Sequence, residues 1–126
     1  MKVILAVAAG GAVGAVLRHL VNVQSMLWFG PGFPWSTLFV NIVGSFLMGA
    51  LVEASALVWS PGPALRAMIA VGFLGALTTF SSFSLDTASL YQRGELLTAF
   101  GYVVVSVVLS IGAFFLALAV VRAVLQ

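Results

Sequence analysis

The stretch from residue 72 to residue 84 reads GFLGALTTFSSFS, and it decides how the chain can fold. Its thirteen positions hold two glycines and five hydroxyl side chains within a longer uncharged run, residues 67–85. Glycine weakens a helix, and Ser or Thr side chains can satisfy backbone groups that a helix break sets free. One interpretation is therefore a helix broken at membrane depth. The other is a continuous Ser/Thr-rich helix packed closely on a neighbour, and the pattern leaves both open.

The composition around this stretch is that of a membrane protein. The 126 residues are 63% hydrophobic and 6% charged, whereas a soluble domain carries about 25% charged residues. Further uncharged runs cover 19–52 and 96–121, and a bilayer span takes roughly 20 apolar residues. The sequence predicts an all-α integral membrane protein in one domain, residues 1–126, with four transmembrane helices. We expect the spans at about 3–20, 36–59, 64–91 and 96–121.

The composition also excludes several classes of protein. There is no cysteine and only one histidine, His19, so disulfides, thiolate nucleophiles and Cys- or His-rich metal clusters are ruled out. The net charge of +2 rests on very few charges and does not indicate nucleic acid as a partner. No nucleophile–base pair is visible, so we do not expect an enzyme.

The positive charges are almost evenly divided between the two sides of the predicted four-span chain. Lys2, Arg66 and Arg122 fall on one side, and Arg18 and Arg93 fall on the other. The positive-inside rule therefore does not choose an orientation. A chain of this kind can insert both ways and pair as an antiparallel dimer, although a single orientation remains the alternative.

Two of the predicted spans carry polar side chains at four-residue spacing. Thr37, Asn41 and Ser45 form such a stripe in the second span, where Asn41 is either interhelical glue or a donor to a passing solute. In the fourth span the same spacing aligns hydroxyl groups on one side of the helix. These hydroxyl groups belong to Tyr102, Ser106 and Ser110.

Phe80 and Phe83 are three positions apart and project from nearly the same helix face. Apolar packing is the ordinary reason for such a pair. The alternative is that their ring edges, which carry partial positive charge, contact an anion.

Other residues have local interpretations. Gly10 and Gly14 have the spacing that lets helices approach closely. Arg18, expected at the end of the first span, either reaches to the interface or lines a vestibule for anions. Glu53 is expected to reach the membrane surface. Asp86 would fall in the first turn of a second half-helix, if the third span is broken.

The intramembrane polar groups are mostly neutral donors, which suit a small anion that must both bind and leave. Proton-coupled transport is expected to place an ionisable residue at mid-membrane, so passive conduction is favoured. The main alternative is a small proton-coupled multidrug antiporter, but the first span has no acidic residue. A purely structural membrane subunit would explain the glycines but not the polar stripes.

Three motifs in this order resemble the Fluc-type (CrcB-like) fluoride channels of bacteria. They are GGAVGAVLR at 10–18, Val40-Asn41, and TTFSSFS at 78–84, and the resemblance covers essentially the full length. Ser82 stands where many relatives have Thr, and His19 replaces an aromatic residue.

The resemblance implies a passive, fluoride-selective channel of the bacterial inner membrane that exports fluoride and so reduces its toxicity. It implies an antiparallel, dual-topology homodimer in membrane lipid, with a structural Na⁺ at the dimer centre held by the backbone carbonyls of Gly75 and Thr78. It assigns the fluoride pathway to Arg18, Asn41, Phe80, Ser82, Phe83, Tyr102, Ser106 and Ser110.

Overall fold

The computed structural model describes all 126 residues, and every regular element in it is helical. The elements are α1 (Lys2–Phe29), α2 (Trp35–Leu57), α3 (Pro63–Ala67), the π-helical segment η1 (Met68–Leu74), α4 (Gly75–Leu77), α5 (Phe80–Gln92) and α6 (Leu96–Leu125). Elements α3 to α5 together make one segment, so four segments are long and apolar enough to cross a membrane. This confirms the predicted all-α fold with four membrane-spanning helices.

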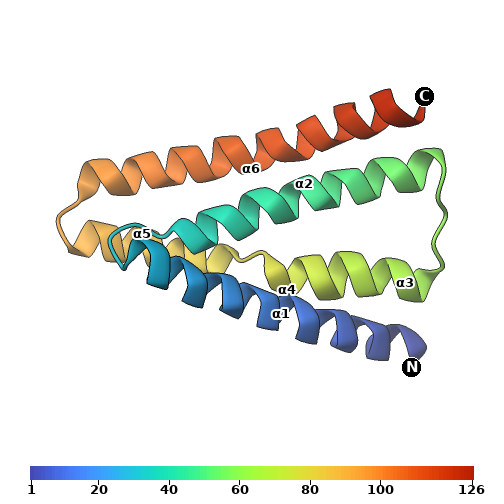
Figure 1. Ribbon diagram of the computed structural model, residues 1–126, viewed down its shortest axis with the longest axis horizontal. Coiled ribbons are helices and arrows are strands. Elements are labelled where there is room, and N and C mark those ends of the chain that lie inside the picture. Colours follow the sequence, from blue (N-terminus) through green and yellow to red (C-terminus); the bar gives the residue numbers. More distant parts are fainter.

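The helices lie side by side in the order α6, α2, third span, α1 (Figure 1). α2 packs mainly on α6, and α1 packs mainly on η1. Both chain termini and the α2–α3 connection lie at one end, and the other two connections lie at the opposite end (Figure 1). An even number of spans requires this arrangement.

Glycine and proline set the ends of the helices. α1 ends at Gly30, whose φ of 70° is in the left-handed region that favours glycine. Pro63 opens α3 at a position where its missing N–H costs nothing. Gly94, with φ of 78°, makes the turn before α6.

The first helix is longer than the predicted first span, and this corrects the expected position of Arg18. α1 continues past Leu20 as far as Phe29, so Arg18 lies well inside the helix and not at its end. Polar residues such as Asn22 end an apolar run, but they do not end a helix. The first backbone breaker after Leu20 is Gly30.

The third span is broken, which settles the two interpretations left open by residues 72–84. Thr78 (φ −82°, ψ 156°) and Thr79 (φ −155°, ψ 116°) are extended between α4 and α5. The break is visible in Figure 1 as a thin segment near the middle of the span. The sequence did not predict the π-helical segment η1 that precedes α4.

The predicted close approach at Gly10 and Gly14 is confirmed. A Cβ atom on Gly10 would collide with the carbonyl oxygen of Met68, and one on Gly14 with that of Phe73. From the other side, a Cβ on Gly72 would lie 2.6 Å from the carbonyl oxygen of Val7. Small residues thus let α1 and η1 touch backbone to backbone.

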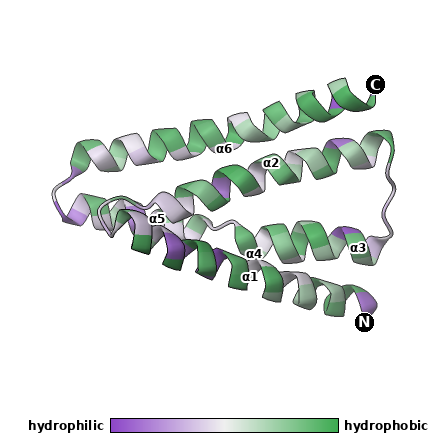
Figure 2. Cartoon of the chain, in the orientation of Figure 1, coloured by the Kyte–Doolittle hydropathy of each residue, from purple (hydrophilic) through white to green (hydrophobic).

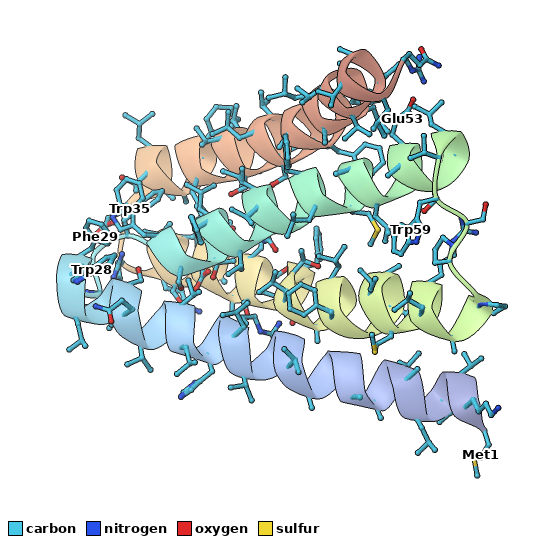
Figure 3. The ribbon with its side chains drawn as sticks, turned by 45° about the vertical axis from the view of Figure 1, so that its right-hand side comes forward. Met1, Trp28, Phe29, Trp35, Glu53 and Trp59 are labelled. Carbon is cyan, nitrogen blue, oxygen red and sulfur yellow. The ribbon has the colours of Figure 1, made fainter.

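Most of the surface is apolar. Only 17 of 126 residues are buried, and large hydrophobic side chains are exposed along all four spans. Figure 2 shows hydrophobic colouring along the helices and polar colouring at the connections. Trp35 and Trp59 lie toward opposite ends of the molecule (Figure 3), as expected for residues of the membrane interface. These features define an integral membrane protein.

Candidate functional site

The break in the third span is held by the side chain of Asn41 in α2. Its Oδ1 accepts a hydrogen bond of 2.8 Å from the Thr79 N–H, and its Nδ2 donates one of 3.1 Å to the Thr79 carbonyl. Asn41 is therefore interhelical glue, one of its two predicted roles. Since Nδ2 carries two N–H groups, one donor is left for another partner.

Two threonines complete the ends of the half-helices. The Thr78 hydroxyl donates to the Leu74 carbonyl (2.9 Å), which closes the last turn before the break. The Thr79 hydroxyl accepts from the Ser82 N–H (3.0 Å) and is the N-cap of α5. Asp86 was expected in the first turn of this half-helix, and that prediction is wrong. The helix restarts at Phe80, so Asp86 lies in the second turn.

Beside the break is an open cavity of about 430 Å³ between α2, the third span and α6. Of the predicted pathway residues it brings together Asn41, Phe80, Phe83, Ser106 and Ser110. Ser45, Thr78 and Thr79 also line it. The polar groups of this lining are hydroxyls, one amide and backbone, so none carries a full charge.

The predicted phenylalanine pair forms one wall of this cavity. The two ring centroids are 5.4 Å apart, with an angle of 50° between the ring planes. Phe80 is 79% exposed, so the rest of the chain leaves this wall largely uncovered. Phe83 is half-buried, and its ring centroid is 5.3 Å from that of Tyr102.

On the opposite wall, two serines of α6 have no hydrogen-bond partner. The Oγ atoms of Ser106 and Ser110 are buried, and neither is bonded within the chain. A buried polar group without a partner costs free energy, so such groups in a cavity are suited to bind a ligand. Ser55 also has a buried, unpaired hydroxyl, but it does not line the cavity.

Tyr102 shares the α6 stripe with these serines but does not line the cavity. Its side chain is buried, and its hydroxyl donates a hydrogen bond of 3.1 Å to Asp86 of α5. Its ring also meets that of Phe33 edge to face. Tyr102 therefore supports Phe83 from behind.

Arg18 and Ser82 are in a second cavity, of about 350 Å³, on the side of α1. Thr37 and Asp86 also line it, and Thr79 lines both cavities. Arg18 is half-buried, and its Nη1 lies 3.5 Å from the Thr78 carbonyl oxygen, to which it donates. The guanidinium thus reaches the break, not the membrane surface.

An ion pair at the other end of the molecule was missed by the sequence analysis. Glu53 was expected to reach the membrane surface, but it is 5% exposed and accepts a hydrogen bond of 2.7 Å from Arg122 Nε. Figure 3 shows Glu53 near the end of the molecule where the chain terminates. The signal was available, because an acidic residue inside a span needs a partner, and Arg122 is predicted on the same side.

Together the fold and the two cavities define a small polytopic membrane protein whose interior is suited to a small polar solute or ion. Residues 5–118 match the family model described as CrcB-like protein, Camphor Resistance (CrcB). The chain belongs to the CrcB-like family.

Several relatives are similar over nearly their whole length. The chain is 53% identical to the fluoride-specific ion channel FluC of Rhodospirillum centenum, over 97% of each chain. It is 55% identical to FluC of Agrobacterium fabrum, over 92% of this chain and 93% of the relative. It is 50% identical to FluC of Nitrobacter winogradskyi, over 94% of each.

Proposed function

We propose that this protein is a passive, fluoride-selective ion channel of the bacterial inner membrane. Its relatives are named fluoride-specific ion channels. The observation that carries the proposal is the pair of buried, unpaired hydroxyls of Ser106 and Ser110 facing the cavity of Asn41, Phe80 and Phe83. An ion channel is not an enzyme, which agrees with the absence of catalytic motifs in the sequence.

The arrangement gives fluoride a series of neutral donors in place of water. The hydroxyls of Ser106 and Ser110 can each donate one hydrogen bond, and Asn41 keeps one N–H free. The edges of the Phe80 and Phe83 rings add weak positive potential. Because no donor in this lining carries a full charge, the ion is bound without being trapped. We propose that selectivity over chloride comes from a narrow, donor-rich path that the larger ion does not fit.

Arg18 gives the α1 side of the break a positive charge. The Arg18 guanidinium attracts anions to its part of this cavity, the Asp86 carboxylate in the same lining offsets part of that charge, and Ser82 and Thr37 supply hydroxyl groups there. We propose this cavity as the vestibule. Thr79, which lines both cavities, is at the boundary between vestibule and pore. Tyr102 lines neither cavity, and it supports the pathway through its contacts with Phe83 and Asp86.

The proposed assembly is an antiparallel homodimer, supported by the near-even division of positive charge and the exposure of Phe80. A second copy would cover the open wall of the cavity. The chain has no cysteine, so a single Ser60→Cys in the α2–α3 connection reports orientation. Dual topology predicts that a membrane-impermeant thiol reagent labels about half of the chains from either side. Labelling from one side alone contradicts it.

The backbone at the break fits a structural sodium ion, a hard cation that prefers oxygen ligands. The Thr79 N–H, which would pair with the Gly75 carbonyl in a continuous helix, is bonded to Asn41. The Gly75 carbonyl is therefore left without that donor, and Gly75 is exposed where a second copy could meet it. The Thr78 carbonyl accepts only the long 3.5 Å bond from Arg18 and keeps a lone pair. Bound there, the ion would supply a positive charge that links the broken span of this chain to the broken span of the second copy.

A test in cells follows from the chemistry. Fluoride enters cells as HF and is trapped as the anion, most strongly in acid medium. Bacteria that lack their own fluoride exporter should therefore regain growth in fluoride when they express this chain, with the largest gain at low pH. No gain from a protein present in the membrane would contradict the proposal.

A further inference from the structure

We propose that Asn41 is a positioning residue for the cation site, because it keeps the third span broken and the Gly75 carbonyl free. This inference rests on the proposed structural sodium and gives Asn41 a role besides donating to fluoride. The relationship that carries it is the two-point contact between the Asn41 amide and the backbone of Thr79.

In a continuous helix each N–H bonds the carbonyl four residues earlier, so the Thr79 N–H would pair with the Gly75 carbonyl. The preceding pair is intact, since Thr78 N–H bonds the Leu74 carbonyl at 3.0 Å. The helical pattern therefore stops at the residue that Asn41 holds.

At the break the side-chain amide of Asn41 replaces a peptide group as the partner of Thr79. Its Oδ1 and one of its two N–H groups both bond that residue, as the backbone of a neighbouring strand would. Thr79 is 8% exposed, so its backbone groups depend mainly on partners within the protein. Without Asn41, the Thr79 N–H has the Gly75 carbonyl as its natural partner.

α2 also contacts the break at a second point. A Cβ atom on Gly44 would collide with Cγ2 of Thr78, so α2 lies directly against that side chain. Asn41 and Gly44 are three residues apart and share a helix face. Both contacts with the break, from Asn41 and from Gly44, therefore come from a rigid helix and not from a loop.

The consequence is a linkage between Asn41 and cation binding. If Asn41 is replaced by Leu, which has a similar shape and no polar group, the Thr79 N–H turns to the Gly75 carbonyl. The carbonyl is then engaged, and sodium binds more weakly. Asn41→Asp keeps an oxygen acceptor for the Thr79 N–H and loses only the donor to the Thr79 carbonyl. Because the N–H decides whether the Gly75 carbonyl is free, this variant should keep the sodium response. Ser45→Ala is the matched control, because Ser45 lines the same cavity one turn along α2.

The experiment measures Tm of the detergent-purified full-length protein without fluoride, in sodium chloride against N-methyl-D-glucamine chloride. A cation that binds only the folded state raises Tm. We expect a sodium-dependent rise in Tm for the wild type, Ser45→Ala and Asn41→Asp, and none for Asn41→Leu. If Asn41→Leu does not fold, Asn41→Asp remains decisive, because a loss of its sodium response overturns the inference.

Two other results overturn the inference without touching the channel proposal. One is an unchanged sodium response in Asn41→Leu, and the other is a wild type that shows no sodium response. Fluoride efflux from the same wild-type preparation is measured separately. Its absence would count against the proposed function, whatever the sodium result.

Discussion

The hydroxyl of Tyr102 donates a 3.1 Å hydrogen bond to the carboxylate of Asp86, and this links α6 to the second half of the broken span. The same tyrosine ring lies 5.3 Å, centroid to centroid, from Phe83. One side chain thus fixes both the position of α5 and the back of the phenylalanine wall.

Tyr102→Phe should therefore destabilise the protein. The change removes a hydrogen bond to a half-buried charged group, worth about 1.5–3 kcal/mol. Chemical unfolding in detergent micelles measures the loss. Tyr91→Phe is the control, because Tyr91 is 65% exposed and lies outside this contact. In a double-mutant cycle with Asp86→Asn, a coupling energy near zero would show that the contact has no energetic role.

Ser106→Ala should separate stability from transport. It removes a buried hydroxyl that has no partner, so stability should rise by about 1 kcal/mol, while fluoride efflux should fall. Ser55→Ala removes an equally unpaired hydroxyl outside the cavity. It should stabilise the protein and leave efflux unchanged. Equal effects of the two variants on efflux would refute the role of Ser106.

Gly14→Ala should weaken the contact between α1 and η1. Its new Cβ atom meets the Phe73 carbonyl, and forcing extra volume into packed backbone costs about 1–3 kcal/mol. Gly11→Ala is a matched control in the next turn, where the nearest atom is 3.9 Å from the new Cβ. That substitution should be neutral or stabilise the helix by about 0.5–1 kcal/mol. Unfolding midpoints that do not distinguish the two variants would contradict the close packing.

Glu53→Gln should leave fluoride efflux unchanged, because Glu53 lines neither of the two cavities described above. Arg122→Gln should lower Tm more than Glu53→Gln does. Arg122→Gln leaves the buried Glu53 carboxylate without its partner, whereas Glu53→Gln leaves an Arg122 side chain that is 61% exposed and stays solvated. Efflux assays and thermal unfolding test the two statements. Loss of transport in Glu53→Gln would instead favour a proton-coupled exchanger.

The sequence predicted the four spans because uncharged apolar runs of bilayer length are too hydrophobic for helices that face water. It also placed the irregular part of the third span within residues 72–84. It could not choose between a break and a packed helix, because the side chain that bonds the backbone at the break, Asn41, comes from another span. Such partners are not visible in local patterns.

The candidate site was predicted only in part, because local patterns show neighbours on one helix but not partners on another. Spacing aligned Ser106 with Ser110 and Phe80 with Phe83, since neighbours on one helix face follow from periodicity. The position of Arg18 was wrong, because hydropathy marks the end of an apolar run and not the end of a helix. The pair Tyr102–Asp86 joins residues from different spans, so spacing gave no sign of it. For Glu53 and Arg122 the sign was not their spacing but their predicted position on the same side.

The most direct test of the central claim is fluoride release from liposomes that contain the purified protein, followed with a fluoride electrode, with chloride release measured in parallel. We predict rapid release of fluoride and not of chloride, lost in Phe80→Ile and Phe83→Ile. The release should be retained in Phe100→Ile, whose ring is exposed on α6 and does not line the cavity. Chloride release as fast as that of fluoride, or no release from a folded protein, would contradict the account.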